Sequence, residues 1–249
     1  GFMNARCWRG SRANRLDGAG APVPDGAMRA LFILLFLLAA CGRPLTGPET
    51  ELAARLFGDS LNPAPVRLYR NGFVGMTEHR YATRPRTTCR ERLAPPATGP
   101  FETGRFAGVA FANRIHLRPD VHRRDFARND QGGVTLAAAM FLAHELTHVW
   151  QWQNRARTGF TPWRAGAEHQ PGVDPYLFDA DSTPRFLDYP FEQQASLVEE
   201  YVCCAVLDPA GARTARLRAL LAQEMAPEAL PVGAVTLPWD GVERRGICG

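Results

Sequence analysis

Apolar side chains recur at helical spacing in four segments of the chain. The longest spans residues 134–154, where neither proline nor glycine interrupts the pattern. A run of that kind predicts an amphipathic helix of about twenty residues. Shorter helices are expected at residues 49–57, 190–207 and 210–225.

Between residues 66 and 117 the pattern changes to short apolar or alternating runs that are broken by glycine and proline. Runs of this kind predict β-strands, which we expect at residues 66–69, 72–76, 105–111 and 114–117. We expect these strands to form a small, mostly antiparallel sheet packed on the helices, which gives an α+β fold. Residues 157–189 are rich in Pro, Gly and Asp and predict a long excursion, a kind of segment that is usually functional or mobile.

The N-terminal part of the chain contains an uninterrupted apolar run at residues 31–40. A transmembrane helix needs about 20 apolar residues, so this run has instead the length of the apolar centre of a signal peptide. The run ends in the letters LAAC, which resemble the lipobox of bacterial lipoproteins, with Cys41 as the lipidated residue. An ordinary cleaved signal that leaves Cys41 as a plain thiol is the alternative. Both predict export.

These features predict a simple domain organisation. We expect residues 1–27 to be an upstream or non-native extension and residues 28–41 to be the signal peptide. Residues 42–48 contain Pro, Gly and Thr without apolar periodicity, which suits a short tether to a lipid anchor. Residues 49–249 are expected to form a single domain.

Export changes the expected state of the cysteines, because disulfides persist in oxidising compartments. Cys89, Cys203, Cys204 and Cys248 remain within the expected domain. Four cysteines allow three pairings, and a bond between the adjacent Cys203 and Cys204 would be strained. We therefore expect Cys89 and Cys248 each to pair with one of these two. The spacing does not fit a structural zinc site of the CxxC type.

The predicted helix at residues 134–154 carries the motif HELTH at residues 144–148. Residues four apart lie on one face of a helix, so His144 and His148 can direct both imidazoles at one point. Zinc accepts such nitrogens, and a catalytic zinc site then needs one more protein ligand and an open position for water. Glu145 lies beside the first ligand, where it can act as general base.

The third ligand decides the class of zinc site. The metzincin pattern HExxHxxGxxH would require Gly at 151 and His at 154, but the chain has Gln151 and Asn154, so this class is excluded. The predicted helix at residues 190–207 instead offers acidic side chains.

The combination of HELTHVWQ with the downstream letters EQQA resembles the gluzincin arrangement and, more narrowly, a group of bacterial predicted metallopeptidases. The resemblance covers about residues 105–205, and it implies a zincin-like fold with Glu192 as the third zinc ligand. Glu199 is seven residues further on and shares a helical face with Glu192, so it is expected either to support a ligating histidine or to be the ligand itself. The familiar Glu-xxx-Asp spacing is not met, because position 196 is Ser. A solvated helix face is the alternative for Glu192, Glu199 and Glu200.

Peptide hydrolysis also needs a group that stabilises the developing oxyanion. The candidates are His116, His169, Tyr176 and Tyr189. Aromatic side chains that either line a substrate cleft or belong to the core are Trp150, Trp152 and Trp163.

Charge gives little reason to expect a nucleic-acid partner. Of the net charge of +4, residues 1–40 supply +3, from five Arg against two Asp, which leaves about +1 for the rest of the chain. A nearly neutral domain lacks the basic surface that nucleic-acid binding requires.

The expected function is that of a zinc-dependent peptide-bond hydrolase of the bacterial cell envelope, acting on a peptide or protein substrate. We expect the protein to be anchored by an N-terminal lipid, either in the periplasm or at the outer membrane, or otherwise to be secreted. Two alternatives stay open: a non-catalytic, zinc-containing binding or scaffold lipoprotein, and a zinc amidase acting on cell-wall peptides.

Overall fold

The computed structural model describes residues 42–249, except for 171, 181, 183, 184, 231 and 232. The predicted extension, the signal peptide and Cys41 lie outside the described residues. Within the described part, no helix combines the length and the apolar character that a membrane span requires.

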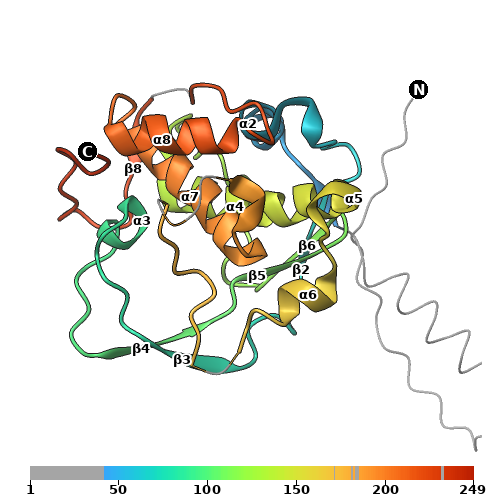
Figure 1. Cartoon of the computed structure of the whole chain (residues 1–249), viewed down its shortest axis with the longest axis horizontal. Helices are drawn as coiled ribbons and strands as arrows, with labels where there is room; N and C mark the ends of the chain where they lie inside the picture. The colour runs from blue at the N-terminus through green and yellow to red at the C-terminus, as the bar shows by residue number, and fades with distance from the viewer. Residues whose placement is uncertain (1–41, 171, 181, 183–184, 231–232) are drawn as a thin grey trace, which may run out of the picture. The chain divides into compact units, whose positions relative to one another are not determined.

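Two long helices, α4 (Leu136–Gln153) and α7 (Phe191–Leu207), pack against each other at the centre of the fold. Helix α8 (Ala212–Leu221) packs on α7, and α2 (Gly47–Phe57) packs on α4 (Figure 1). These are the four helices that the apolar spacing predicts. The shorter helical segments are α3 (Cys89–Arg92), α5 (Arg155–Thr158), α6 (Pro162–Gly166), η1 (Gly58–Ser60) and η2 (Phe186–Asp188).

A small four-stranded sheet packs on α4 through its strand β5 and lies below α4 in Figure 1. Its order is β1 (Arg43–Pro44), β2 (Arg67–Arg70), β6 (Arg114–Leu117) and β5 (Gly108–Phe111). The β2–β6 ladder is parallel and the two outer ladders are antiparallel. The α+β prediction, with a small sheet packed on helices, is thus confirmed, and the sheet is mixed.

Two further ladders have two strands each. β3 (Glu78–Ala82) pairs with β4 (Phe101–Arg105) in an antiparallel hairpin, and β7 (Val134–Thr135) pairs in parallel with β8 (Val235–Thr236).

The predicted strand at residues 72–76 is wrong, because this segment forms a turn. Asn71 directs the turn: its side-chain oxygen accepts from the Phe73 N–H and its carbonyl accepts from the Val74 N–H. Gly75 then adopts a φ of +71°, which suits glycine. The predicted strand at residues 105–111 is divided, because its beginning belongs to β4 and its end to β5. At residues 72–76, the local hydrogen bonds of the Asn71 side chain thus decide the backbone conformation against the apolar alternation of the sequence.

The segment expected as a tether, residues 42–48, instead contributes β1 and the first residues of α2. Thr46 accepts from the Glu49 N–H and Glu49 accepts from the Thr46 N–H, which makes a capping box. The buried Glu49 carboxylate also receives two hydrogen bonds from the guanidinium of Arg43. A buried carboxylate needs such partners, so this part of the chain is fixed to the domain.

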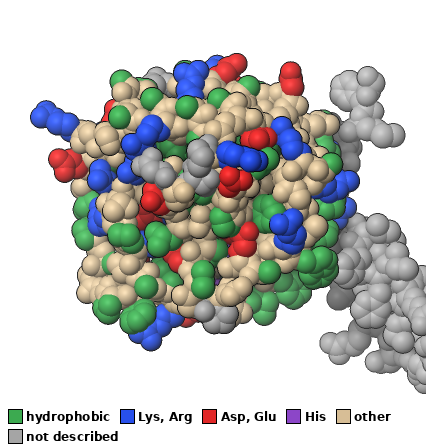
Figure 2. All heavy atoms as spheres, viewed as in Figure 1, with side chains coloured by type: hydrophobic (Ala, Val, Ile, Leu, Met, Phe, Trp, Pro, Cys, Tyr) green, Lys and Arg blue, Asp and Glu red, His purple; other side chains and the backbone are tan. Residues whose placement is uncertain are grey.

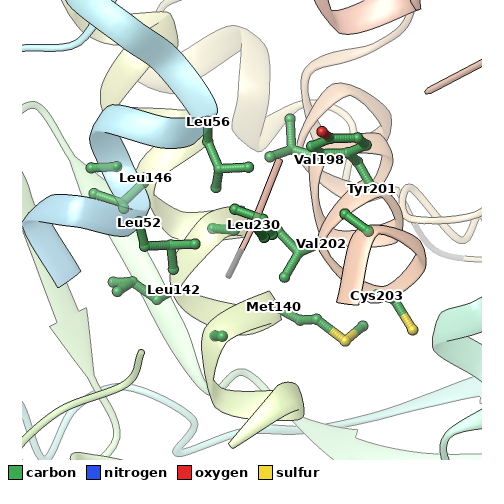
Figure 3. Packing of buried hydrophobic residues seen from close by; sticks show 14 of the residues in the cluster. Leu52, Leu56, Met140, Leu142, Leu146, Val198, Tyr201, Val202, Cys203 and Leu230 are labelled. Carbon is green, nitrogen blue, oxygen red and sulfur yellow. The ribbon is translucent and has the colours of Figure 1, made fainter. Parts of the chain in front are cut away.

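The core lies where α2, α4 and α7 meet (Figure 3). Leu56 of α2, Leu146 of α4 and Val202 of α7 have no exposed surface. Burying each aliphatic side chain of this size contributes about 1.5–3 kcal/mol before the entropy of ordering is subtracted. Because Leu146 lies within HELTH, the same helix that carries the motif is fixed by core packing.

Two disulfides join α7 to other parts of the chain. Cys89 of α3 is bonded to Cys203, and Cys204 is bonded to Cys248 near the C-terminus. The prediction that Cys89 and Cys248 each pair with one member of the adjacent pair is confirmed.

On the face shown in Figure 2, basic and acidic side chains are interspersed and hydrophobic ones gather along the lower edge, where Figure 1 places β3 and β4. Phe101, the first residue of β4, has 52% of its surface exposed. The charge on this face forms no block of one sign.

Candidate metal centre

Helix α4 directs both histidines of HELTH at one point, as their spacing predicts. His144 Nε2 and His148 Nε2 lie 3.3 Å apart. Glu192 Oε2, from the first turn of α7, lies 3.2 Å from each of these nitrogens. These three buried groups can hold a metal ion.

The distances fit zinc. Zinc binds imidazole nitrogen and carboxylate oxygen at about 2.0–2.1 Å with tetrahedral geometry, which sets neighbouring ligand atoms about 3.3 Å apart. The three distances of 3.2–3.3 Å match the edges of such a tetrahedron. Two imidazoles with one carboxylate also form a donor set that binds zinc in preference to calcium or magnesium, because these two ions prefer oxygen ligands.

Glu199 occupies the supporting position. Its Oε2 lies 3.4 Å from His144 Nδ1, the nitrogen that faces away from the other two groups. A carboxylate there fixes the ring and makes the opposite nitrogen a better ligand. Of the two roles open for Glu199, the structure therefore favours support of a ligand.

The interpretation of the acidic residues as a solvated helix face is wrong for all three. Glu192 is 7% exposed and Glu200 has no exposed surface. Glu200 accepts hydrogen bonds from the backbone N–H groups of Cys89 and Arg90, and lies 3.2 Å from the guanidinium of Arg213. Its role is structural, at the beginning of α3.

His148 is supported by a residue that sequence reasoning missed. Gln151 Oε1 lies 2.9 Å from His148 Nδ1, and the Gln151 amide donates to the carbonyl of Phe191 and to Gln194 Oε1. Gln194 in turn donates to the carbonyl of Tyr189. The sequence signal was a polar residue three positions after a ligand, on the same helical face.

Two residues of the long excursion position Glu192. The carboxylate of Glu168 accepts from the N–H groups of Phe191 and Glu192, which are otherwise unpaired at the beginning of α7. His169 Nε2 lies 3.0 Å from Glu192 Oε1, the oxygen that does not face the other histidines. Two neighbouring residues of the excursion therefore fix the position of the Glu192 side chain.

Glu145 is buried beside the two histidines, and its Oε2 has no hydrogen-bond partner among the described residues. Burial raises the pKa of this carboxyl, while the neighbouring His144 and His148 oppose the rise. Gly108 of β5 packs directly on it, since a Cβ at this position would lie 2.6 Å from Glu145 Oε1. Leaving a buried carboxylate oxygen without a hydrogen-bond partner is costly.

The site is a compact set of opposing charges. Burial alone would lower the pKa of His144, but Glu192 and Glu199 outweigh it and raise the pKa to about 10. Burial would raise the pKa of Glu192, but His148 and the hydrogen bonds from the histidines hold it well below its usual value. The carboxylates thus favour positive charge at the point where the three ligand atoms converge.

A cleft of about 710 Å³ opens onto this centre. One wall consists of the β3–β4 hairpin and the beginning of β5, and the other of residues 169, 170 and 172–176. His144, Glu145 and Glu199 lie on its floor. A closed structural zinc site has no such opening.

Of the four candidate oxyanion donors, Tyr176 is the one that fits. It lines the cleft, its ring centre lies 5.7 Å from that of His144, and no described residue hydrogen-bonds to its hydroxyl. Burial and the charges of Glu192 and Glu145 raise the pKa of Tyr176, so the hydroxyl keeps its proton.

The side chains of the other three candidates contact other residues, although His169 also lines the cleft. His169 contacts Glu192, and Tyr189 donates its hydroxyl to the carbonyl of Asp179. His116 stacks on Tyr69 of the sheet and does not line the cleft.

The three tryptophans do not line the cleft. Trp150 is fully buried and donates to Ser60 Oγ, Trp152 stacks on Phe111, and Trp163 is 87% exposed. Of the two roles considered for them, Trp150 belongs to the core.

The fold is similar to that of the effector domain of VgrG2b from Pseudomonas aeruginosa. The likeness has a TM-score of 0.50 at 24% sequence identity, and it covers 80% of this chain and 94% of that domain. It is a likeness of fold. No protein-family model matches the sequence, and no curated protein matches it either. Beside this likeness of fold, the described residues His144, His148 and Glu192 form a group that can hold a metal ion.

The charge arrangement predicts that metal binding depends on pH. Protons and zinc compete for the same imidazole nitrogens, and with a pKa of about 10 the metal-free His144 is protonated at neutral pH. We therefore expect zinc binding at pH 7 to release protons, and the affinity to fall as the pH falls. Calorimetric titration with zinc in two buffers of different ionisation enthalpy measures this release. Equal heats in both buffers would contradict the prediction.

Proposed function

We propose that this protein is a zinc-dependent hydrolase of peptide bonds. The observation that carries the proposal is the buried, unpaired Oε2 of Glu145 beside the converging ligands His144, His148 and Glu192. A structural zinc site needs no such group, whereas hydrolysis needs a base within reach of a water molecule.

Zinc in this position would lower the pKa of a water molecule and polarise the substrate carbonyl. Glu145 takes a proton from the attacking water, for which its desolvated carboxylate and raised pKa are suited. The same carboxyl then passes the proton to the leaving nitrogen as the C–N bond breaks. Tyr176 donates a hydrogen bond to the oxygen on which negative charge develops.

An open strand edge supports a peptide substrate. β5 is an outer strand of the sheet, and no described strand pairs with its free edge. The Arg118 N–H donates to the carbonyl of Ala107. Because hydrogen-bonded pairs alternate along an antiparallel ladder, the backbone groups of Gly108 and Ala110 point to the free edge. An extended peptide can pair there, and Gly108 lies against Glu145.

The cleft and the metal site also bear on the two alternative functions. A scaffold protein would have no use for a cleft that opens onto a free base, so the cleft favours catalysis. A zinc amidase acting on cell-wall peptides would use the same metal site. Comparing the rate of cleavage of defined peptides with that of purified cell-wall fragments distinguishes the two hydrolases.

The Glu145→Gln variant tests the base. Because the amide cannot accept the proton, we expect kcat to fall by about 10² to 10⁴-fold, while zinc content stays at one per chain. The control is Glu102→Gln, an exposed position on β4, which should keep wild-type activity. A Glu145→Gln variant that cleaves peptides as fast as the wild type would exclude this mechanism.

The Tyr176→Phe variant tests the oxyanion donor. Loss of one such donor lowers kcat by about 10² to 10³-fold, and zinc binding should be unchanged because the hydroxyl is not a ligand. The matched control is Tyr189→Phe, whose hydroxyl donates to Asp179 outside the cleft. Equal kcat values for the two variants would remove Tyr176 from the mechanism.

We further propose that the enzyme works in the cell envelope, held there by a lipid on Cys41. The support is the apolar run at residues 31–40, the lipobox-like letters that follow it, and two disulfides, which are typical of exported proteins. Metabolic labelling with a fatty-acid analogue should mark the wild-type protein and leave the Cys41→Ser variant unmarked. Labelling of neither would contradict the anchor.

A further inference from the structure

Arg90 lies between two parts of the candidate site, Glu199 and the segment of Tyr176, and contacts none of the three candidate metal ligands directly. It is the second residue of the short helix α3, and its side chain is only 12% exposed. One guanidinium nitrogen, Nη1, lies 3.4 Å from Glu199 Oε2 and donates to Ser196 Oγ at 3.1 Å. The other, Nη2, donates to the carbonyl of Tyr176 at 3.2 Å.

The oxygen of Glu199 that Arg90 contacts is the one that faces His144. Glu199 Oε2 lies 3.4 Å both from Arg90 Nη1 and from His144 Nδ1. The position of this oxygen therefore depends on Arg90, and the orientation of the His144 ring depends on the oxygen. Through its second nitrogen, the same guanidinium holds the backbone of Tyr176.

We propose that Arg90 is a positioning residue that couples the metal ligand His144 to the Tyr176 segment of the cleft wall. The inference rests on the proposed zinc centre and adds a residue to it. One planar group spans Glu199 on α7 and Tyr176 on the excursion, so the ligand orientation and the cleft wall are fixed together.

Arg90 is itself held from three directions. The carboxylate of Glu91 accepts from its Nε and Nη2 at 2.8 and 2.7 Å. The buried carboxylate of Glu200 accepts from its backbone N–H at 3.0 Å. The disulfide between the preceding Cys89 and Cys203 joins α3 to the same helix that carries Glu199. A side chain fixed in this way can transmit position, since little freedom remains to absorb a displacement.

Lysine cannot replace this arginine. The guanidinium presents donors in a rigid planar fork, whereas the ammonium is a single point charge on a flexible stem. Arg90→Lys keeps the positive charge beside Glu199 and loses the simultaneous bonds to Ser196, Glu199 and the Tyr176 carbonyl. The variant therefore separates geometry from charge.

The experiment measures the zinc dissociation constant by competition with a chelator, together with kcat and KM on a peptide. Loss of a group that supports a metal ligand weakens metal affinity by about 10 to 100-fold, and we expect Arg90→Lys to weaken it by about 10-fold. The matched control is Arg92→Lys in the same helix, whose guanidinium contacts the carbonyls of Arg86 and Ile247. The control should keep the wild-type zinc affinity, because Arg92 has no contact with Glu199. If Arg90 only stabilised α3, both variants would weaken zinc binding alike.

A double-mutant cycle with Glu199→Gln shows whether Arg90 acts through Glu199. Coupled residues give non-additive effects, so the double variant should bind zinc little more weakly than Glu199→Gln alone. Additive effects, or an unchanged zinc dissociation constant in Arg90→Lys, would overturn the proposal. If Arg90→Lys does not fold, Ser196→Ala removes one acceptor of the same guanidinium and should weaken zinc binding by a smaller factor; an unchanged affinity there would also overturn it.

The two readouts keep this inference separate from the proposed function. A weakened zinc affinity in a protein that cleaves no peptide would support the positioning role and contradict peptide hydrolysis. Normal cleavage by the wild type with unchanged zinc affinity in Arg90→Lys would support hydrolysis and contradict the positioning role.

Discussion

The packing of α4 along α7 is the contact on which the candidate site depends. Leu146 and Val149 of α4, and Val198 and Val202 of α7, are fully buried in the shared core. Close-packed interiors allow little displacement, so this contact sets how far α7 lies from HELTH. Glu192, at the beginning of α7, therefore meets the two histidines because of helix packing, and not because of its spacing from them along the chain.

Such an arrangement places several charges in the interior, which is costly unless each is paired. The pairing is nearly complete: Glu192 faces three histidines, Glu199 faces His144 and Arg90, and Glu200 faces Arg213. Five buried side-chain atoms of the described residues lack a hydrogen-bond partner, and Glu145 Oε2 is the one whose residue lines the cleft. Such an unpaired oxygen lowers stability, and at the floor of the cleft it lies beside the groups that can hold the metal ion.

The groups that orient the candidate ligands come from segments far apart in the chain. His144 is supported from α7 and, through Arg90, from α3; His148 is supported from its own helix by Gln151. Glu192 is held by Glu168 and His169 of the excursion. The disulfides then join α3 and the C-terminal tail to α7. An extended framework therefore holds a site of three converging atoms.

The sequence by itself determined the features that arise from local periodicity and fixed spacing. Helical spacing places His144 and His148 on one face of α4 whatever surrounds them, and it predicted all four longer helices. The third ligand could be named only by resemblance, and the support from Gln151, Glu168 and Arg90 was not predicted, because spacing along the chain carries no information about contacts between distant segments. The strand predicted at residues 72–76 failed for a related reason: the side chain of Asn71 directs a turn there. Only tertiary packing decided that Glu192 meets both histidines while Glu199 supports His144 from its other ring nitrogen. The reason is that this choice depends on the depth and rotation at which α7 packs on α4.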